Sequence, residues 1–180
     1  MINKSCISLR TLDIEKDLQR FHDAYSDPLS MKFYGMKAFT NEDQSLNLMR
    51  NYIDSEEKQI SVHRVICEQD TNDYMGEIGI FNINRLHHRA NAYCILLPEY
   101  RKKGISIIAS ALFYREVFGL MQINRIQALV DSRNHGAINS LKGIGFAYEG
   151  MLSQYEFFDN EYIDMVVFAL LKERFYELYS

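Results

Sequence analysis

Three consecutive cations followed by a glycine, from Arg101 to Gly104, have the side chains and spacing needed to bind an anion. An apolar run ends at Pro98 just before them, and a long helical pattern begins at Ile105 just after them. The first N–H groups of a helix lack internal partners, and the helix dipole adds partial positive charge there. Gly104 would let the backbone approach a guest closely. The stretch predicts an anion site with phosphate as its guest, and a basic surface turn is the alternative.

Composition indicates one ordinary folded domain. The chain has 180 residues, of which 47% are hydrophobic and 24% are charged, so we expect a single domain over 1–180. The net charge of −4 gives no reason to expect nucleic acid binding. Cys6, Cys67 and Cys94 lie far apart and without metal-ligand spacing, so we expect reduced thiols and no metal site.

The chain also lacks the sequence marks of membrane insertion or secretion. No apolar run approaches the length of a membrane span, and residues 1–5 do not begin the apolar core of a signal peptide. We therefore expect a cytoplasmic protein that binds neither membrane nor nucleic acid.

Periodicity places the cationic turn between a strand and a helix of a larger sheet. Alternation and apolar runs predict strands over 7–12, 60–67, 74–83, 90–97, 125–130, 146–158 and 162–170. Helices are predicted after Asp13, after a capping box at 40–43, over 105–120, over 134–142 and from 171 onward. The strands between 60 and 97 should pair antiparallel, whereas the passage from 90–97 through the helix to 125–130 should be a parallel crossover.

Two further features are expected to be local irregularities. Gly76 and Gly79 lie inside one predicted strand, where glycine often marks a bulge or a close approach of another backbone. The stretch 29–39 is expected to be irregular. Its apolar residues predict either a lid over the core or the wall of a substrate site.

The motifs together resemble the GNAT superfamily of N-acetyltransferases. Residues 101–106 are similar to its acyl-CoA-binding pattern Gln/Arg-x-x-Gly-x-Gly/Ala, with Ser106 as the final small residue. Residues 134–150 resemble its Asn motif followed by Gly-Phe-x-x-Glu-Gly, and 26–28 and 159–164 are similar to the ribosomal-protein branch and to spermidine acetyltransferases. The resemblance implies an α/β (α+β) fold with a mixed, mostly antiparallel central sheet flanked by helices.

The resemblance also implies an enzyme that transfers the acetyl group of acetyl-CoA to a primary amine by direct attack on the thioester. The backbone of Cys94, Ile95 and Leu96 would pair with the pantetheine arm as an added strand does. The amides from Arg101 to Ile107 would hold the pyrophosphate.

The segment from Asn134 onward would complete the cofactor site. Asn134 would bond the pantetheine or hold its helix, with a plain helix cap as the alternative, and 137–143 would flank the cofactor. The cofactor-binding residues implied are Cys94, Ile95, Leu96, Arg101, Lys102, Lys103, Gly104, Ile105, Ser106, Ile107, Asn134, Ala137 and Leu141.

The catalytic acid and base are not identified by the sequence. Many relatives have a Tyr seven residues after the motif Asn that protonates the thiolate, and this chain has Leu141 there. Relatives often have Glu where this chain has Asn91. Weak candidates are Glu77, Tyr93, Ser140 and Tyr155. Each has a plainer interpretation, and for Glu77 an outward surface carboxylate is favoured.

Several functions stay open at this point. The acceptor could be a protein N-terminus or a small amine. A polyamine acetyltransferase is the close alternative, although 35–37 reads Gly-Met-Lys where the spermidine enzymes carry acidic residues. A non-catalytic acyl-CoA sensor is the alternative from another class, because Leu141 and Asn91 cannot move protons. The final hairpin and an exposed sheet edge could form a homodimer.

Overall fold

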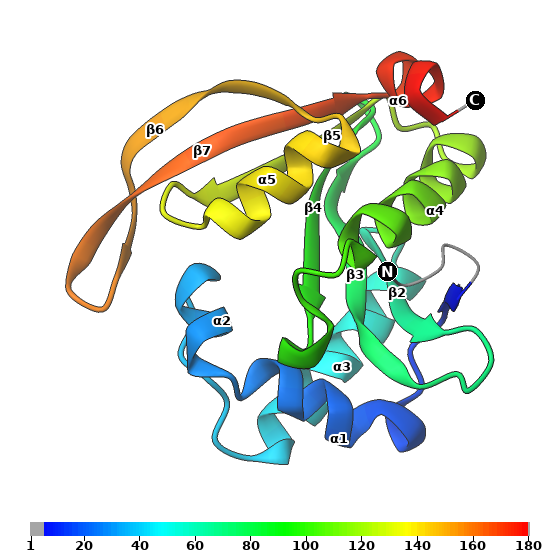
Figure 1. The fold of residues 1–180 in the computed structure, drawn as a ribbon, viewed down its shortest axis with the longest axis vertical. Coiled ribbons are helices and arrows are strands. Elements are labelled where there is room, and N and C mark those ends of the chain that lie inside the picture. The colour runs from blue at the N-terminus through cyan, green and yellow to red at the C-terminus, as the bar shows by residue number, and fades with distance from the viewer. Residues whose placement is uncertain (1–5, 180) are drawn as a thin grey trace.

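One mixed sheet organises the computed structural model, which describes residues 6–179 (Figure 1). Within that range the sheet has seven strands in the order β1-β2-β3-β4-β5-β7-β6. The strands are β1 Ile7–Arg10, β2 Ser61–Glu68, β3 Tyr74–Asn84, β4 Arg89–Leu96, β5 Arg125–Asp131, β6 Ala147–Phe158 and β7 Glu161–Leu171. Every neighbouring pair is antiparallel except β4–β5, which is parallel. The predicted sheet and its single parallel crossover are confirmed. The expectation about residues 1–5 concerns a segment outside the described range.

Helices cover both faces of this sheet. They are α1 Ile14–Tyr25, α2 Pro28–Phe33, α3 Glu42–Glu57, α4 Ile105–Leu120, α5 His135–Ile144 and α6 Lys172–Tyr179. None of the helices in the described range is long and apolar enough to cross a membrane. The first, α1, begins where the sequence predicts, because the Asp13 carboxylate accepts hydrogen bonds from the N–H groups of Glu15 and Lys16.

Two local predictions about the helices are wrong. The stretch expected to be irregular begins with the six-residue α2, which Asp27 caps and which has Pro28 in its first turn. The capping box of α3 is shifted by one residue. Asn41 is the cap, and the side chain of Gln44, not Asp43, reaches back to the Thr40 N–H at 2.8 Å.

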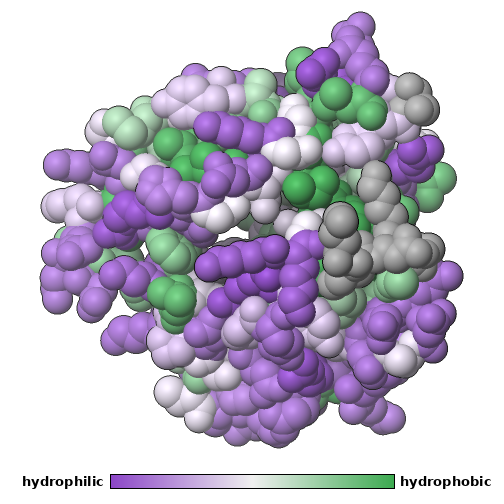
Figure 2. Space-filling model, in the orientation of Figure 1, coloured by the Kyte–Doolittle hydropathy of each residue, from purple (hydrophilic) through white to green (hydrophobic). Residues whose placement is uncertain are grey.

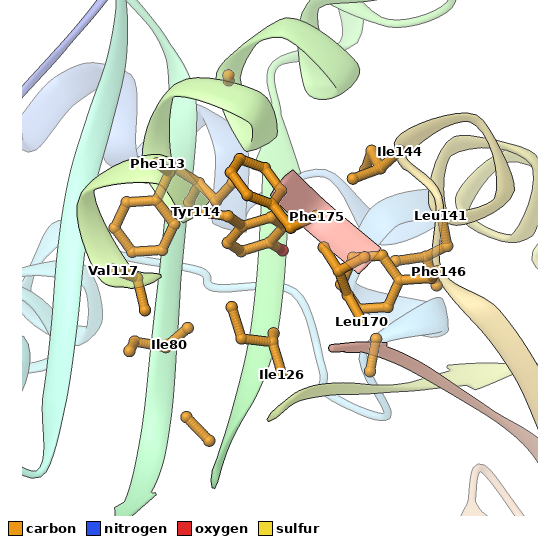
Figure 3. Packing of buried hydrophobic residues seen from close by; sticks show 14 of the residues in the cluster. Ile80, Phe113, Tyr114, Val117, Ile126, Leu141, Ile144, Phe146, Leu170 and Phe175 are labelled. Carbon is orange, nitrogen blue, oxygen red and sulfur yellow. The ribbon is translucent and has the colours of Figure 1, made fainter. Parts of the chain in front are cut away.

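Each face of the sheet has its own hydrophobic core. On one face, Phe113 and Tyr114 of α4 pack against Ile80 of β3, Ile126 of β5 and Phe175 of α6 (Figure 3). On the other face, α1, α2 and α3 cover a second core, which includes Phe21, Met31, Met49, Val65 and Ile95. Strands β2, β3 and β4 therefore carry apolar side chains on both sides, which fixes them firmly in the middle of the molecule.

The two strand glycines mark close approaches, as predicted. A Cβ on Gly76 would lie 2.2 Å from the carbonyl oxygen of Ile95, and the β2–β3 register shifts at the neighbouring pairs. A Cβ on Gly79 would lie 2.5 Å from the Tyr93 ring and 2.8 Å from the Val62 carbonyl oxygen. Strand β3 can lie this close to its neighbours only because it has no side chain at these positions.

Glu77 of β3 lies in a polar cluster inside the second core, so its interpretation as a surface carboxylate is wrong. Its side chain is 1% exposed and accepts a hydrogen bond from the Tyr25 hydroxyl, which also bonds the Tyr52 hydroxyl at 2.7 Å. Burial raises the pKa of Glu77 to about 8, and the hydrogen bond from Tyr25, which lowers the pKa, offsets only part of this effect. The carboxyl group is therefore mostly protonated at neutral pH.

This burial predicts a pH-dependent stability. The pKa of Glu77 rises from 4.5 to about 8 on folding, so between these values the folded state keeps a proton that the unfolded state has lost. The free energy of unfolding should fall as pH rises through this range, by up to about 1.4 kcal/mol per pH unit. Glu77→Gln keeps the shape without titrating, and urea unfolding at pH 5 and pH 8 should show a flatter dependence. The exposed Glu57→Gln control should behave as wild type, and equal pH dependence in all three proteins would contradict the assignment.

Candidate active site

The parallel strands β4 and β5 pair only at their beginnings. Arg89, Ala90 and Asn91 pair with residues 125–127, after which β4 continues to Leu96 and β5 to Asp131 without further pairing. Figure 1 shows the two strands diverging, and Figure 2 shows a hollow between the surface over α5 and the β6–β7 hairpin and the surface over α1 and α2. We call the opening between 92–96 and 128–131 the β4–β5 wedge. The wedge leaves the backbone groups along this edge of β4 without a strand partner, although β4 lies in the middle of the sheet.

The open edge of β4 presents the backbone of Cys94 and Leu96. The Leu97 N–H donates to the Met75 carbonyl beside β3 at 3.0 Å. Because backbone groups alternate in direction along a strand, those of Leu96 and Cys94 face the wedge and those of Ile95 face β3. Arg101 Nε donates to the Leu96 carbonyl at 2.9 Å, and the Tyr34 hydroxyl donates to the Cys94 carbonyl. The structure thus places two of the three predicted pantetheine-pairing residues at the wedge.

The turn before α4 has the form of an anion cradle. Gly104 caps α4 with φ at 78°, in the left-handed region that favours glycine, and no side chain caps this helix. The amides of Arg101 and Ile107 donate to the carbonyls of Pro98 and Gly104. The amides from 102 to 106 have no acceptor in the described part of the chain. A Cβ on Gly104 would meet no protein atom within 4 Å, so this side of the turn is open to a guest.

The three cations of this turn have different surroundings. Arg101 points back into the protein, where Nη1 forms an ion pair with Asp27 at 2.9 Å and Nη2 is buried without a hydrogen-bond partner. Lys102 and Lys103 are exposed, and Lys103 Nζ lies 5.7 Å from the centre of the Tyr100 ring. The lysines, rather than Arg101, present their charge to an anion at α4.

Helix α5 is packed against α4 by small residues. Asn134 accepts a hydrogen bond from the Ala137 N–H at 3.0 Å, so its role as a helix cap is confirmed. The Ser140 hydroxyl lies 3.1 Å from the Ser106 hydroxyl, which ties the two helices together near the anion cradle. Leu141 is buried in the first core. None of these side chains is an acid that could donate a proton at the open edge of β4.

Tyr93 faces the second-core side of β4, where its hydroxyl lies 2.8 Å from His63 Nδ1. His63 Nε2 lies 2.7 Å from the Ser61 hydroxyl, and the Tyr52 ring stacks on the imidazole at 3.9 Å. Burial lowers the pKa of His63 to about 4, so the ring is neutral at physiological pH. Tyr52 and His63 also line a cavity of about 320 Å³ together with Thr11, Leu12, Ile53, Glu56 and Glu57.

Sequence reasoning missed His63 and the position of Tyr34. His63 lies two residues from Ser61 and two from Val65, on the buried face of β2, and this period of two was the signal that could have found it. Nothing in the local sequence links His63 to Tyr93. Met31 of α2 is fully buried, so the stretch 29–39 covers the core as a lid would, and Tyr34 reaches the wedge. Its part in a substrate site stays a prediction. Tyr155, the remaining candidate, lies on β6 and is 57% exposed.

The family is established by a match to the model of the acetyltransferase (GNAT) domain over residues 7–147. Among curated proteins, the chain is 23% identical over 162 residues to the uncharacterized N-acetyltransferase YoaA of Bacillus subtilis, covering 89% of this chain and 90% of that protein. It is 24% identical over 169 residues to the spermidine N(1)-acetyltransferase of Escherichia coli K12, covering 94% and 88%. These matches do not single out the ribosomal-protein branch, which stays a prediction.

The fold agrees with the family match. The structure superposes with a TM-score of 0.85 on the crystal structure of spermidine N-acetyltransferase from Vibrio cholerae in complex with CoA and spermine, at 21% identity. The alignment covers 96% of this chain and 99% of that one. With its mixed sheet, its β4–β5 wedge and its match over most of the sequence, the chain belongs to the GNAT family of acetyltransferases.

Proposed function

We propose that the β4–β5 wedge binds acetyl-CoA and that the protein transfers its acetyl group to a monoamine or a peptide N-terminus. The main observation in support of this proposal is the unpaired edge of β4. The extended pantetheine arm of acetyl-CoA has amide groups that can pair with Cys94 and Leu96 as an added strand does. The pyrophosphate would lie on the amides from 102 to 106, where the α4 dipole and Lys102 and Lys103 favour negative charge.

In this reaction the protein's main task is to position the reactants. Acetyl-CoA supplies an activated thioester, and the amine nitrogen attacks it directly. Holding the reactants in line can supply up to roughly 7–11 kcal/mol of the barrier in ideal cases. The Cys94 N–H is the wedge-facing donor that could stabilise charge developing on the thioester oxygen, since it alternates with groups bound to β3.

Glu156 of β6 supports a cationic amine as the acceptor. Its carboxylate is half-buried beside the end of α2, where a Cβ on Gly35 would lie 3.0 Å from Oε2. No cation of residues 6–179 forms an ion pair with it. One free carboxylate suits one ammonium group, whereas a polyamine needs several. Spermidine is the second candidate acceptor, because several of the curated relatives are named spermidine N(1)-acetyltransferase.

We also propose that the chain forms one cytoplasmic acetyltransferase domain. β7 pairs with β5 inside the sheet, so the segment after residue 147 completes the same domain. Cys6, Cys67 and Cys94 are free thiols, in keeping with a reducing compartment.

The edge strand β6 supports a homodimer. Tyr148, Met151, Tyr155 and Phe157 are each more than half exposed along this edge. An exposed apolar edge strand offers unpaired backbone groups and apolar surface to which another chain can bind. Light scattering after size exclusion should therefore give a dimer mass for wild type and a monomer mass for Met151→Lys, and a wild-type monomer would contradict the proposal.

The cofactor site predicts a ligand-induced stabilisation that depends on Gly104. Acetyl-CoA and CoA, but not ATP, should raise the melting temperature, since a hundredfold excess over Kd stabilises by about 2.7 kcal/mol. Gly104→Val adds a Cβ to the cradle at a positive φ and should abolish the ligand-induced shift. Gly119→Val, near the end of the same helix, should keep it. A full shift in Gly104→Val would refute the site.

The acceptor site predicts a kinetic effect of Glu156. Free-thiol release should be screened with peptide N-termini, monoamines and spermidine. For the amine that turns over best, Glu156→Gln should raise the KM about tenfold or more, because a charged hydrogen bond is worth about 1.5–3 kcal/mol. The exposed Glu173→Gln is the matched control. An unchanged KM would exclude Glu156 from the site, and cofactor binding without any thiol release would favour an acyl-CoA sensor.

A further inference from the structure

We propose that Tyr34 is a catalytic residue that donates a proton to the CoA sulfur as it leaves. This inference rests on the proposed binding of acetyl-CoA in the β4–β5 wedge. No helix α5 side chain described above can serve this purpose, and Tyr34 directly follows α2, on the other side of the opening.

Helix α2 is held beside the mouth of the wedge by a contact at each of its ends (Figure 1). Asp27, its cap, forms an ion pair with Arg101 of the anion cradle at 2.9 Å. Tyr34 directly follows the helix and donates its hydroxyl to the Cys94 carbonyl of β4. These contacts place the hydroxyl at the open edge.

The direction of the wedge places the reacting end of acetyl-CoA near this hydroxyl. The anion cradle follows closely after Leu96, and Arg101 bonds the Leu96 carbonyl directly. The wedge closes at the other end, at Asn91. An arm with its phosphates at the cradle therefore runs along the edge from Leu96 past Cys94. The Tyr34 hydroxyl, on the Cys94 carbonyl, lies towards the thioester end.

The other groups with a transferable proton near this edge are otherwise engaged. Ser140 bonds Ser106, and the Tyr93 hydroxyl bonds His63 on the second-core side of β4. The Cys94 side chain packs against the first core, and burial raises the pKa of its thiol to about 12. Among the described residues along this edge, Tyr34 differs in that its hydroxyl bonds only the Cys94 carbonyl. An amide N–H of the pantetheine arm can replace the hydroxyl as the donor to that carbonyl.

The chemical step balances with Tyr34 in this role. The ammonium group of the acceptor first loses a proton to solvent, which leaves a neutral amine with a free electron pair. As this nitrogen forms its bond to the thioester carbon, the carbon–sulfur bond breaks and its electron pair moves to sulfur. Tyr34 leaves the Cys94 carbonyl and gives its proton to that sulfur. The acylated nitrogen releases its extra proton to solvent, and the tyrosinate takes a proton back from solvent. The freed Cys94 carbonyl accepts an amide N–H of the arm.

A spectroscopic test separates this role from binding. The ultraviolet absorbance of the thiolate is titrated in the CoA complex, with the complex of the CoA analogue lacking sulfur as the blank. A hydroxyl that donates to the thiolate stabilises it, so Tyr34→Phe should make the bound thiol about tenfold or more less acidic. Tyr176→Phe is the control, because Tyr176 lies on α6, which packs against α4 and β7.

The outcomes of this titration are distinct. Equal acidity in wild type and Tyr34→Phe overturns the role of Tyr34, whereas failure of wild type to bind CoA overturns the proposed function itself. With the amine found in the thiol-release screen, Tyr34→Phe should lower kcat about a hundredfold or more while both KM values change little. An unchanged kcat, or a rise in KM alone, also overturns the proposal.

Discussion

The candidate active site depends on the loss of pairing between two parallel strands in the middle of a sheet. β4 and β5 share three residue pairs and then separate, which leaves backbone donors and acceptors of β4 without a strand partner. Unpaired buried backbone groups are costly, so such a gap persists only where the rest of the structure holds both strands. β3 holds β4 along its other edge, and β7 holds β5 over its whole length.

Side chains from outside the sheet also bond some of the backbone carbonyls that the gap leaves unpaired. Arg101 donates to the Leu96 carbonyl and Tyr34 donates to the Cys94 carbonyl, and both of these carbonyls face the gap. Arg101 is joined to Asp27, so the anion cradle, the β4 edge and helix α2 form one connected unit. A change at any of these three parts is expected to reach the other two.

The polar cluster beneath α1 and α3 has a different character. Glu77, Tyr25 and Tyr52 bond one another inside an apolar core, where a neutral carboxyl costs less than a charged one. Tyr93 and His63 extend this polar region along the same face. The cluster thus packs on one face of β3 and β4, and the open edge of β4 forms one side of the wedge. The satisfied hydrogen bonds of the cluster stiffen β4.

Local chemistry made much of this protein readable from its sequence. The cap at Asp13, the cap at Asn134 and the left-handed glycine at 104 each follow from a few neighbouring residues, and so do the strands and the crossover. Only the tertiary structure decided that Glu77 is buried, because both faces of β3 are covered and alternation cannot reveal that. It also decided that Arg101 turns inward to Asp27 and that Tyr34 reaches the open edge of β4. Those positions depend on the α2 segment meeting β4 and the turn that follows β4, and segments this far apart in the chain meet only in the folded molecule.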